Sequence, residues 1–141
     1  AANLIPQPLY DRMQSVLIAH RATFEYVRQP RLLHWDYHFG NLLQRDGKIT
    51  AVLDFEWALG GDPAHDFNRR TEWEEQCPGS MAWVYDGYTS LMPLQRSHET
   101  RVTLYEMFWF LVCVIDAPNV MEANMMLMRV IDRLDWLEEK R

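Results

Sequence analysis

The sequence predicts a single, mainly α-helical domain, residues 1–141, that contains one small β-hairpin. Apolar residues recur at helical spacing over 9–27 and 119–138, and 97–116 is apolar nearly all round. A turn-forming Asp46-Gly47 pair lies between two short apolar runs, which is typical of a hairpin. With 48% hydrophobic and 24% charged residues in 141 positions, the composition indicates one folded domain.

The first helix is expected over 9–27. Its apolar positions follow the helical period: Met13, Val16, Leu17, Phe24 and Val27. Pro30 disfavours helical backbone at the residue before it, so this helix should end there. The hairpin strands are expected at 41–44 and 49–53, on either side of the Asp-Gly turn.

The second half, 68–141, is expected to be helical. A short helix should follow Pro63, with Asp62 as its N-cap. Further helices are expected at 79–92, at 97–116 as a central buried helix, and at 119–138. Asn119 and Glu122 resemble a capping box at the start of the last helix. Its inner face should consist of Leu127, Val130, Leu134 and Leu137.

Charge and hydropathy exclude several classes of protein. The net charge of −6 argues against a protein that wraps nucleic acid through its overall field. The longest apolar run, 107–115, is too short for a membrane span, which needs about 20 residues. No signal peptide is visible, and Cys77 and Cys113 have no paired spacing, so a cytoplasmic protein with reduced, mostly buried thiols is expected.

The segment 33–67 carries the candidate chemistry. Asp36 and Asn41 lie five residues apart in a loop that leads into the first hairpin strand, and Asp54 follows the second strand. The hairpin should therefore bring all three to one end of a rigid ribbon. Two carboxylates and an amide oxygen form a hard-oxygen site suited to Mg²⁺, and a carboxylate off the metal can accept a proton from a hydroxyl. This combination is what phosphoryl transfer requires.

Three motifs occur here in order and with consistent gaps. They are His34-Trp35-Asp36 with Asn41, Leu53-Asp54-Phe55-Glu56, and Gly61-Asp62-Pro63-Ala64-His65-Asp66-Phe67. Together they resemble the catalytic loop and metal-binding segment of the aminoglycoside phosphotransferase and choline kinase family, which is related to protein kinases. The resemblance implies a protein-kinase-like C-terminal lobe of α+β type. It also implies Mg²⁺-dependent transfer of the ATP γ-phosphate to a hydroxyl of a small polar acceptor.

The resemblance assigns a role to each matching residue. Asp36 would be the base that faces the acceptor hydroxyl, and His34 would brace the catalytic loop. Asn41 and Asp54 would hold Mg²⁺ on the nucleotide phosphates. Asp66 would bond to the backbone of the loop and so fix Asp36. One departure from the family pattern is Trp35, which stands where the family usually has glycine.

The nucleotide-binding N-terminal lobe of this family has no counterpart in the sequence. No glycine-rich loop precedes His34, and the two lysines, Lys48 and Lys140, are not placed to bind phosphates. The chain is therefore expected to be a fragment or a natural lone lobe, and to be inactive by itself. Alternatives are a non-catalytic, kinase-derived interaction domain, or half of a split enzyme. In a split enzyme, the surface facing a separate lobe should be apolar and could cause self-association.

The acceptor is not identified by the motifs, and several side chains have alternative interpretations. The acidic balance is compatible with a cationic, aminoglycoside-like or choline-like acceptor, but the family also includes kinases of neutral metabolites. The run Glu72-Trp73-Glu74-Glu75 is interpreted as a solvated face rather than an acidic acceptor site, with Asp86 and Asp116 as weaker candidates. Several other side chains receive structural interpretations: Glu56 as a hydrogen-bonding residue, His38 and His65 as packing residues rather than zinc ligands, and Trp83 and Trp109 as core rather than an aromatic box.

Overall fold

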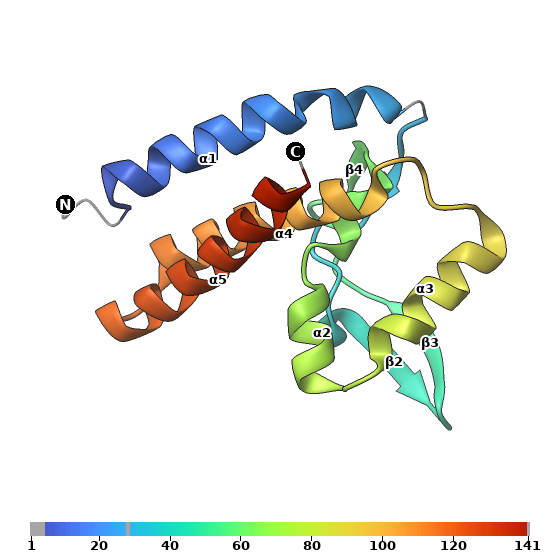
Figure 1. The fold of residues 1–141 in the computed structure, drawn as a ribbon. Helices are drawn as coiled ribbons and strands as arrows, with labels where there is room; N and C mark the ends of the chain where they lie inside the picture. Colours follow the sequence, from blue (N-terminus) through green and yellow to red (C-terminus); the bar gives the residue numbers. More distant parts are fainter. Residues whose placement is uncertain (1–4, 28, 141) are drawn as a thin grey trace.

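The computed structural model describes residues 5–27 and 29–140 and is mainly helical, with two small antiparallel sheets (Figure 1). Its elements in chain order are α1 (Gln7–His20), the 3₁₀ helix η1 (Arg21–Tyr26), β1 (Arg31–Leu33), η2 (Phe39–Asn41), β2 (Leu42–Arg45), β3 (Lys48–Val52), β4 (Leu59–Gly61), η3 (Pro63–Phe67), α2 (Arg70–Gln76), α3 (Ser80–Leu91), α4 (His98–Asp116) and α5 (Val120–Glu139). None of the helices in these ranges is long and apolar enough to cross a membrane.

The predicted hairpin is formed by β2 and β3. Asp46 and Gly47 have φ values of 52° and 73°, and a two-residue hairpin turn with positive φ at both positions explains why this pair was a reliable signal. The expectation of a single hairpin is wrong, because β1 pairs with β4 in a second sheet, with Leu33 opposite Leu59. Each of these strands has only three residues, too few to show an alternating pattern in the sequence.

The first helix is also shorter than predicted. α1 ends at His20, and the chain continues as the 3₁₀ helix η1. The N–H of Val27 donates to the carbonyl of Phe24, three residues back, while the Thr23 carbonyl accepts a bond from the buried guanidinium of Arg101 at 3.3 Å. A partner from α4 thus satisfies the carbonyl that an α-helix would pair with Val27.

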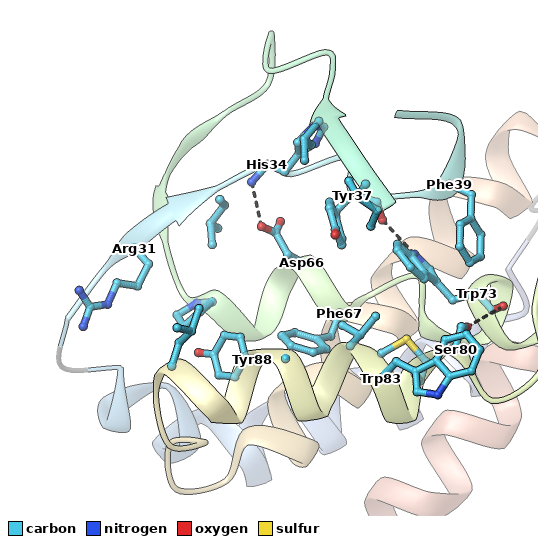
Figure 2. Close-up of a pocket in the computed structure, with 18 of the residues that line it drawn as sticks. Arg31, His34, Tyr37, Phe39, Asp66, Phe67, Trp73, Ser80, Trp83 and Tyr88 are labelled. Carbon is cyan, nitrogen blue, oxygen red and sulfur yellow. Dashed lines mark hydrogen bonds between the residues drawn. The ribbon is translucent and has the colours of Figure 1, made fainter. Parts of the chain in front are cut away.

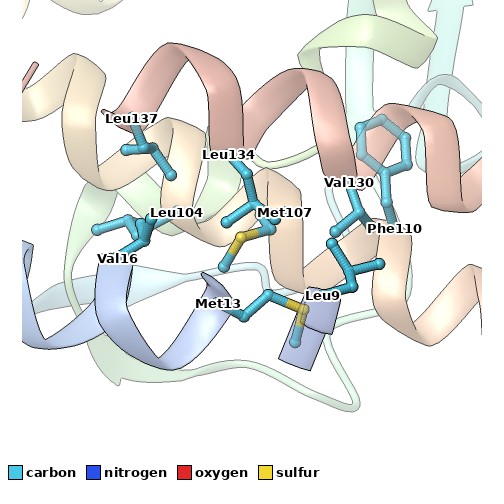
Figure 3. Close-up of a cluster of buried hydrophobic side chains, with 9 residues drawn as sticks. All are labelled: Leu9, Met13, Val16, Leu104, Met107, Phe110, Val130, Leu134 and Leu137. Carbon is cyan, nitrogen blue, oxygen red and sulfur yellow. The ribbon is translucent and has the colours of Figure 1, made fainter. Parts of the chain in front are cut away.

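The main core lies between α1, α4 and α5 (Figure 3). Its buried members are Leu9, Met13 and Val16 from α1, Leu104, Met107 and Phe110 from α4, and Val130, Leu134 and Leu137 from α5. The predicted inner face of α5 is confirmed for the last three residues, whereas Leu127 is only half-buried. Asn119 caps α5 as expected, since its side chain accepts the Glu122 N–H at 3.0 Å.

Helix α4 is central but is not buried all round. It packs against α5 on one side and η3 on another. Phe108, Val112 and Ile115 remain 41%, 45% and 66% exposed, so the prediction of a fully buried helix is wrong for its second half. The apolar sequence there supplies more apolar side chains than the neighbouring helices cover.

A second, smaller core fixes the position of η3. Ala64 and Phe67 of η3 are buried together with Trp73, Met81 and Val102, which come from α2, α3 and α4. The side chain of Asp62 caps η3 by accepting the Ala64 N–H at 3.1 Å, as predicted. Three helices therefore hold this short segment, and it carries Asp66.

Buried ion pairs tie α2 to the long helices. Glu106 of α4 is fully buried and accepts hydrogen bonds from Arg70 of α2 at 3.2 Å and from Arg133 of α5 at 2.9 Å. The hydroxyl of Thr71 bonds to the same carboxylate. Burial by itself would raise the pKa of Glu106, but the Arg133 hydrogen bond and the Arg70 charge outweigh it and lower the pKa.

We expect Glu106→Gln to destabilise the fold by about 3 kcal/mol, because two guanidinium groups lose their shared buried carboxylate. Since the folded-state pKa of Glu106 lies below its ordinary value of 4.5, the wild-type carboxylate stabilises the fold above that pH. That contribution is lost as the pH falls further, and the variant should lack this part of the pH dependence. Urea unfolding at several pH values measures both effects.

The matched control is Glu99→Gln. Glu99 also pairs with Arg70, but its side chain is 52% exposed, so the loss should stay under about 1 kcal/mol. Equal losses for the two variants would contradict the importance assigned to the buried pair.

Candidate active site

The loop that carries Asp36, between β1 and β2, is attached to η3 through one carboxylate. Asp66 accepts the backbone N–H of His34 at 2.8 Å (Figure 2). It also accepts that of Trp35 at 2.9 Å. His34 is buried, and its Nε2 donates to the carbonyl of Leu53 at 2.6 Å. Asp66 thus holds the loop from η3, and His34 links it to the residue before Asp54.

Trp35 adopts a left-handed backbone conformation, with φ of 72°. This conformation favours glycine, which gives a physical reason for the glycine usual at the corresponding family position. Here the Trp35 ring stacks on His65, with ring centroids 3.8 Å apart and an angle of 9° between the planes. Burial lowers the pKa of His65, so the stacked imidazole is neutral at pH 7. The stacking and the Asp66 bond offset the cost of the strained backbone.

Asp36 and Asn41 are brought together, as the sequence predicted. The Asn41 side-chain amide donates to the Asp36 carbonyl at 2.9 Å and to its Oδ2 at 3.3 Å. Asn41 is buried at the end of η2, whereas the side chain of Asp36 is 35% exposed. Because the amide nitrogen of Asn41 faces Asp36, its Oδ1 remains as the atom able to contact a cation.

Asp54 lies close to Asn41 along the hairpin. The Leu53 N–H donates to the Asn41 carbonyl at 2.8 Å, so the residue before Asp54 is bonded directly to Asn41. Asp54 is exposed and has a φ of 63°, in the left-handed region that aspartate adopts more readily than most residues. A carboxylate and an amide oxygen are ligand types that suit Mg²⁺, which uses few protein ligands and keeps several waters. Among the described residues, no group of three or more His, Cys, Asp or Glu could hold a metal.

A comparison with models of known protein families identifies the family of this chain. A sequence model of the phosphotransferase enzyme family matches residues 2–87, which include the whole loop, the hairpin and η3. The chain belongs to this phosphotransferase family. No curated protein and no solved structure gives a match.

One residue of the candidate site was not predicted. The Arg69 guanidinium donates to Asp36 Oδ1 at 2.5 Å and to Glu72 at 2.9 Å, and it lies 4.2 Å from the centroid of the Trp109 ring. His38 also approaches Asp36, with its Nε2 3.3 Å from Oδ2. The available signal was the position of Arg69, three residues after Asp66 and three before Glu72, but which carboxylate it reaches depends on the tertiary fold.

The acidic run does not form an open acceptor site. Glu72 accepts bonds from Arg69 and from the indole N–H of Trp109. Glu74 accepts the backbone N–H groups of Gly79 and Met81 at the start of α3, and Glu75 pairs with Arg129 of α5. All three carboxylates thus have partners within the chain.

Other side chains agree only partly with the sequence interpretation. Trp109 is half-buried, but Trp83 is 70% exposed, so its assignment to the core is wrong. Helical spacing identifies the face on which Trp83 lies, but it does not show whether another element covers that face. Cys77 and Cys113 are free and half-buried.

The two lysines lie away from Asp36. Lys48 begins β3 at the hairpin turn, opposite Arg45. Lys140 follows α5, with its Nζ 5.7 Å from the centroid of the Trp136 ring. Neither position serves as a phosphate clamp beside the catalytic loop.

A cavity of about 720 Å³ lies beside the phosphotransferase loop (Figure 2). It extends from β1 past the hairpin and η3 to α3, and its wall includes His34 and Asp66. Asp36, Asn41 and Asp54 are not among its lining residues. This cavity is therefore distinct from the side of the loop that carries the candidate base and metal ligands.

We expect Asp66→Asn to release the loop from η3. An amide can accept at only one atom, so one of the two backbone N–H groups loses its partner, and the charge assistance is lost from both. Amide hydrogen exchange at His34 and Trp35, measured by NMR, should accelerate, and the free energy of unfolding should fall by about 2 kcal/mol.

Asp116→Asn, which removes an exposed carboxylate at the end of α4, is the control for a general charge effect. Unchanged exchange at both loop amides in Asp66→Asn would show that the carboxylate does not anchor the loop.

Proposed function

We propose that this chain carries the base and the Mg²⁺ site of a small-molecule kinase, which transfers the γ-phosphate of ATP to a hydroxyl of a small polar acceptor. The observation that carries the proposal is the bond between the Asn41 amide and the Asp36 carboxylate, in a loop whose backbone is held by Asp66. Membership of the phosphotransferase family supports it.

Asp36 would orient the acceptor hydroxyl and accept its proton. Its side chain is 35% exposed and therefore reachable by an acceptor. Arg69 and Asn41 contact different carboxylate oxygens, which fixes the orientation of the group before the acceptor arrives. Positioning of this kind is the main protein contribution in phosphoryl transfer, where the chain forms no covalent bond to the phosphate.

Asn41 Oδ1 and the Asp54 carboxylate would hold Mg²⁺ on the nucleotide. The ion, when bound, neutralises charge on the phosphate oxygens. The Leu53–Asn41 backbone bond supports this assignment, because it joins the residue before Asp54 to Asn41. The backbone at Asp54 is left-handed, with φ of 63°. His34 supports the same link by donating to the Leu53 carbonyl.

The acceptor is proposed only as a small polar molecule with a hydroxyl group. The internal pairing of Glu72, Glu74 and Glu75 leaves this acidic run unsuited to bind a polycation. The region near Asp36 also contains the Arg69 guanidinium. These contacts favour a neutral or singly charged acceptor over an aminoglycoside.

The direct test is a calorimetric titration of the chain with Mg²⁺ and ATP. We expect saturable heat that Asp54→Asn reduces at least tenfold in affinity, because one anionic ligand of the ion is lost. Asp46→Asn is the matched control, since it removes a carboxylate from the turn of the same hairpin and asparagine also tolerates the left-handed backbone.

Equal affinities for wild type and Asp54→Asn would contradict the assigned metal ligand. Absence of any heat with a chain that is folded by circular dichroism would contradict nucleotide binding by this lobe alone.

A second candidate function is that of a lobe that docks on a separate partner lobe. The supporting observation is a set of large apolar side chains exposed on the hairpin and the segment after it. Leu43, Ile49, Phe55 and Trp57 are 49%, 60%, 48% and 62% exposed. Exposed apolar patches of this kind mark interaction surfaces. Concentration-dependent association in sedimentation, abolished by Ile49→Lys, would favour this candidate, whereas a monomer at high concentration would count against it.

A further inference from the structure

We propose that the cavity beside the catalytic loop binds an amphipathic monocarboxylate. Its apolar body would lie between the hairpin and α3, and its carboxylate would pair with Arg31. The volume of about 720 Å³ falls within the range of small-molecule sites, roughly 300–1,000 Å³. The proposal does not depend on nucleotide binding, because the cavity wall includes none of Asp36, Asn41 and Asp54.

The wall is formed mainly by aromatic and aliphatic side chains. Figure 2 shows Tyr37, Phe39, Phe67 and Trp83 among them. Trp83 is 70% exposed and Leu91, which also lines the cavity, is 87% exposed. A ligand with an apolar body would cover these side chains, and removal of such surface from water favours binding.

Several polar groups of the wall already have partners within the chain, whereas the buried Nδ1 of His34 has none. Both carboxylate oxygens of Asp66 accept backbone N–H groups, and the ring Nε2 of His34 donates to Leu53. The indole N–H of Trp73 donates to the Tyr37 carbonyl at 3.3 Å, and the Ser80 hydroxyl donates to the Trp73 carbonyl at 3.1 Å. A sugar or a nucleotide would find few partners there to replace its many hydrogen bonds to water, which disfavours ligands that are polar throughout.

Arg31 supplies an uncommitted charge at the wall. Among the residues that the structure describes, Arg31 and Asp66 are the acidic or basic side chains of the wall besides His34, Cys77 and the tyrosines. The Arg31 guanidinium bonds to the Gln29 side chain at 3.0 Å, and no carboxylate within residues 5–27 and 29–140 forms an ion pair with it. Figure 2 shows Arg31 and Tyr88 at the same end of the cavity. A guanidinium matches a carboxylate through two parallel hydrogen bonds, so the charge at this end selects an anionic group.

The test is a tryptophan fluorescence titration of the whole chain with dodecanoate, kept below its micelle concentration. We expect a saturable change, because Trp83 lies in the wall. Arg31→Gln should weaken the affinity about tenfold or more, since a hydrogen-bonded charge pair is lost. Arg21→Gln, which removes an exposed arginine of η1 that does not line the cavity, should leave the affinity unchanged.

A second variant tests the location of the ligand. Gly87 of α3 lines the cavity, and a Cβ placed there would meet no atom within 4 Å. Gly87→Leu should therefore fold normally, which circular dichroism checks, fill part of the cavity and abolish dodecanoate binding.

A second ligand tests the selectivity for charge. Dodecyltrimethylammonium has the same alkyl chain and the opposite charge, and it should bind at least tenfold more weakly than dodecanoate.

The proposal is overturned if the wild-type chain shows no saturable binding, or if Arg31→Gln binds dodecanoate as tightly as wild type. Unchanged binding by Gly87→Leu would place the ligand elsewhere and would overturn it as well. Equal affinities for dodecyltrimethylammonium and dodecanoate would show that the cavity does not select an anionic group, and would also overturn the proposal. If the chain instead dimerises through this cavity, and Gly87→Leu blocks dimerisation without any dodecanoate binding, the occupant is a second copy and the proposal is wrong.

Discussion

The two hydrogen bonds from Asp66 to the backbone of His34 and Trp35 are the constraint on which the rest of the site depends. They join a loop between two short strands to a segment that is packed on three helices. A loop held only by its neighbours in sequence would sample many conformations. Binding a ligand would then lose conformational entropy in ordering the loop, which would weaken the affinity. Because one carboxylate accepts both N–H groups, the backbone next to Asp36 is already ordered before a ligand binds.

The Asp66 carboxylate can hold the loop only if η3 itself is rigid. Contacts from α4 keep η3 in place. The fully buried Arg101 donates to Asp62 at 2.6 Å, immediately before η3, and the same guanidinium bonds to the carbonyls of Thr23 and Arg96. One side chain of α4 therefore links the end of the first helical segment, the loop before α4 and the start of η3. Replacing a partner in such a buried pair costs more than the pair itself contributes, because the remaining charge stays buried. The helical half of the chain thus supports the half that contains the candidate site.

Local features of the chain were predictable from sequence, and long-range pairings were not. The Asp46-Gly47 turn and the Asn119 cap depend on a few adjacent residues, so both were predicted correctly. The β1–β4 sheet joins three-residue strands that are distant in sequence. Neither strand's sequence indicates which other strand it pairs with. The Arg69–Asp36 ion pair is also a long-range contact. The sequence alone did not indicate which of several carboxylates Arg69 would contact.

The solvent exposure of individual side chains was equally hard to infer. Helical periodicity shows on which helix face Trp83 and the apolar residues in the second half of α4 lie. Whether another element covers that face depends on the tertiary packing. The three motifs identified the family correctly, because their order and gaps together are more specific than any one of them. The catalytic roles of Asp36, His34 and Asp66, and the metal roles of Asn41 and Asp54, remain predictions from that pattern.

The central claim is that the anchored loop and the hairpin bring Asn41 and Asp54 to one metal ion on a nucleotide. It is tested most directly by paramagnetic broadening of NMR signals when Mn²⁺ and ATP are added to the isotope-labelled chain. We expect the side-chain amide of Asn41 and the backbone amide of Asp54 to broaden first, well before the amides of the hairpin turn. Broadening centred on other carboxylates, or spread evenly over the acidic surface, would contradict it.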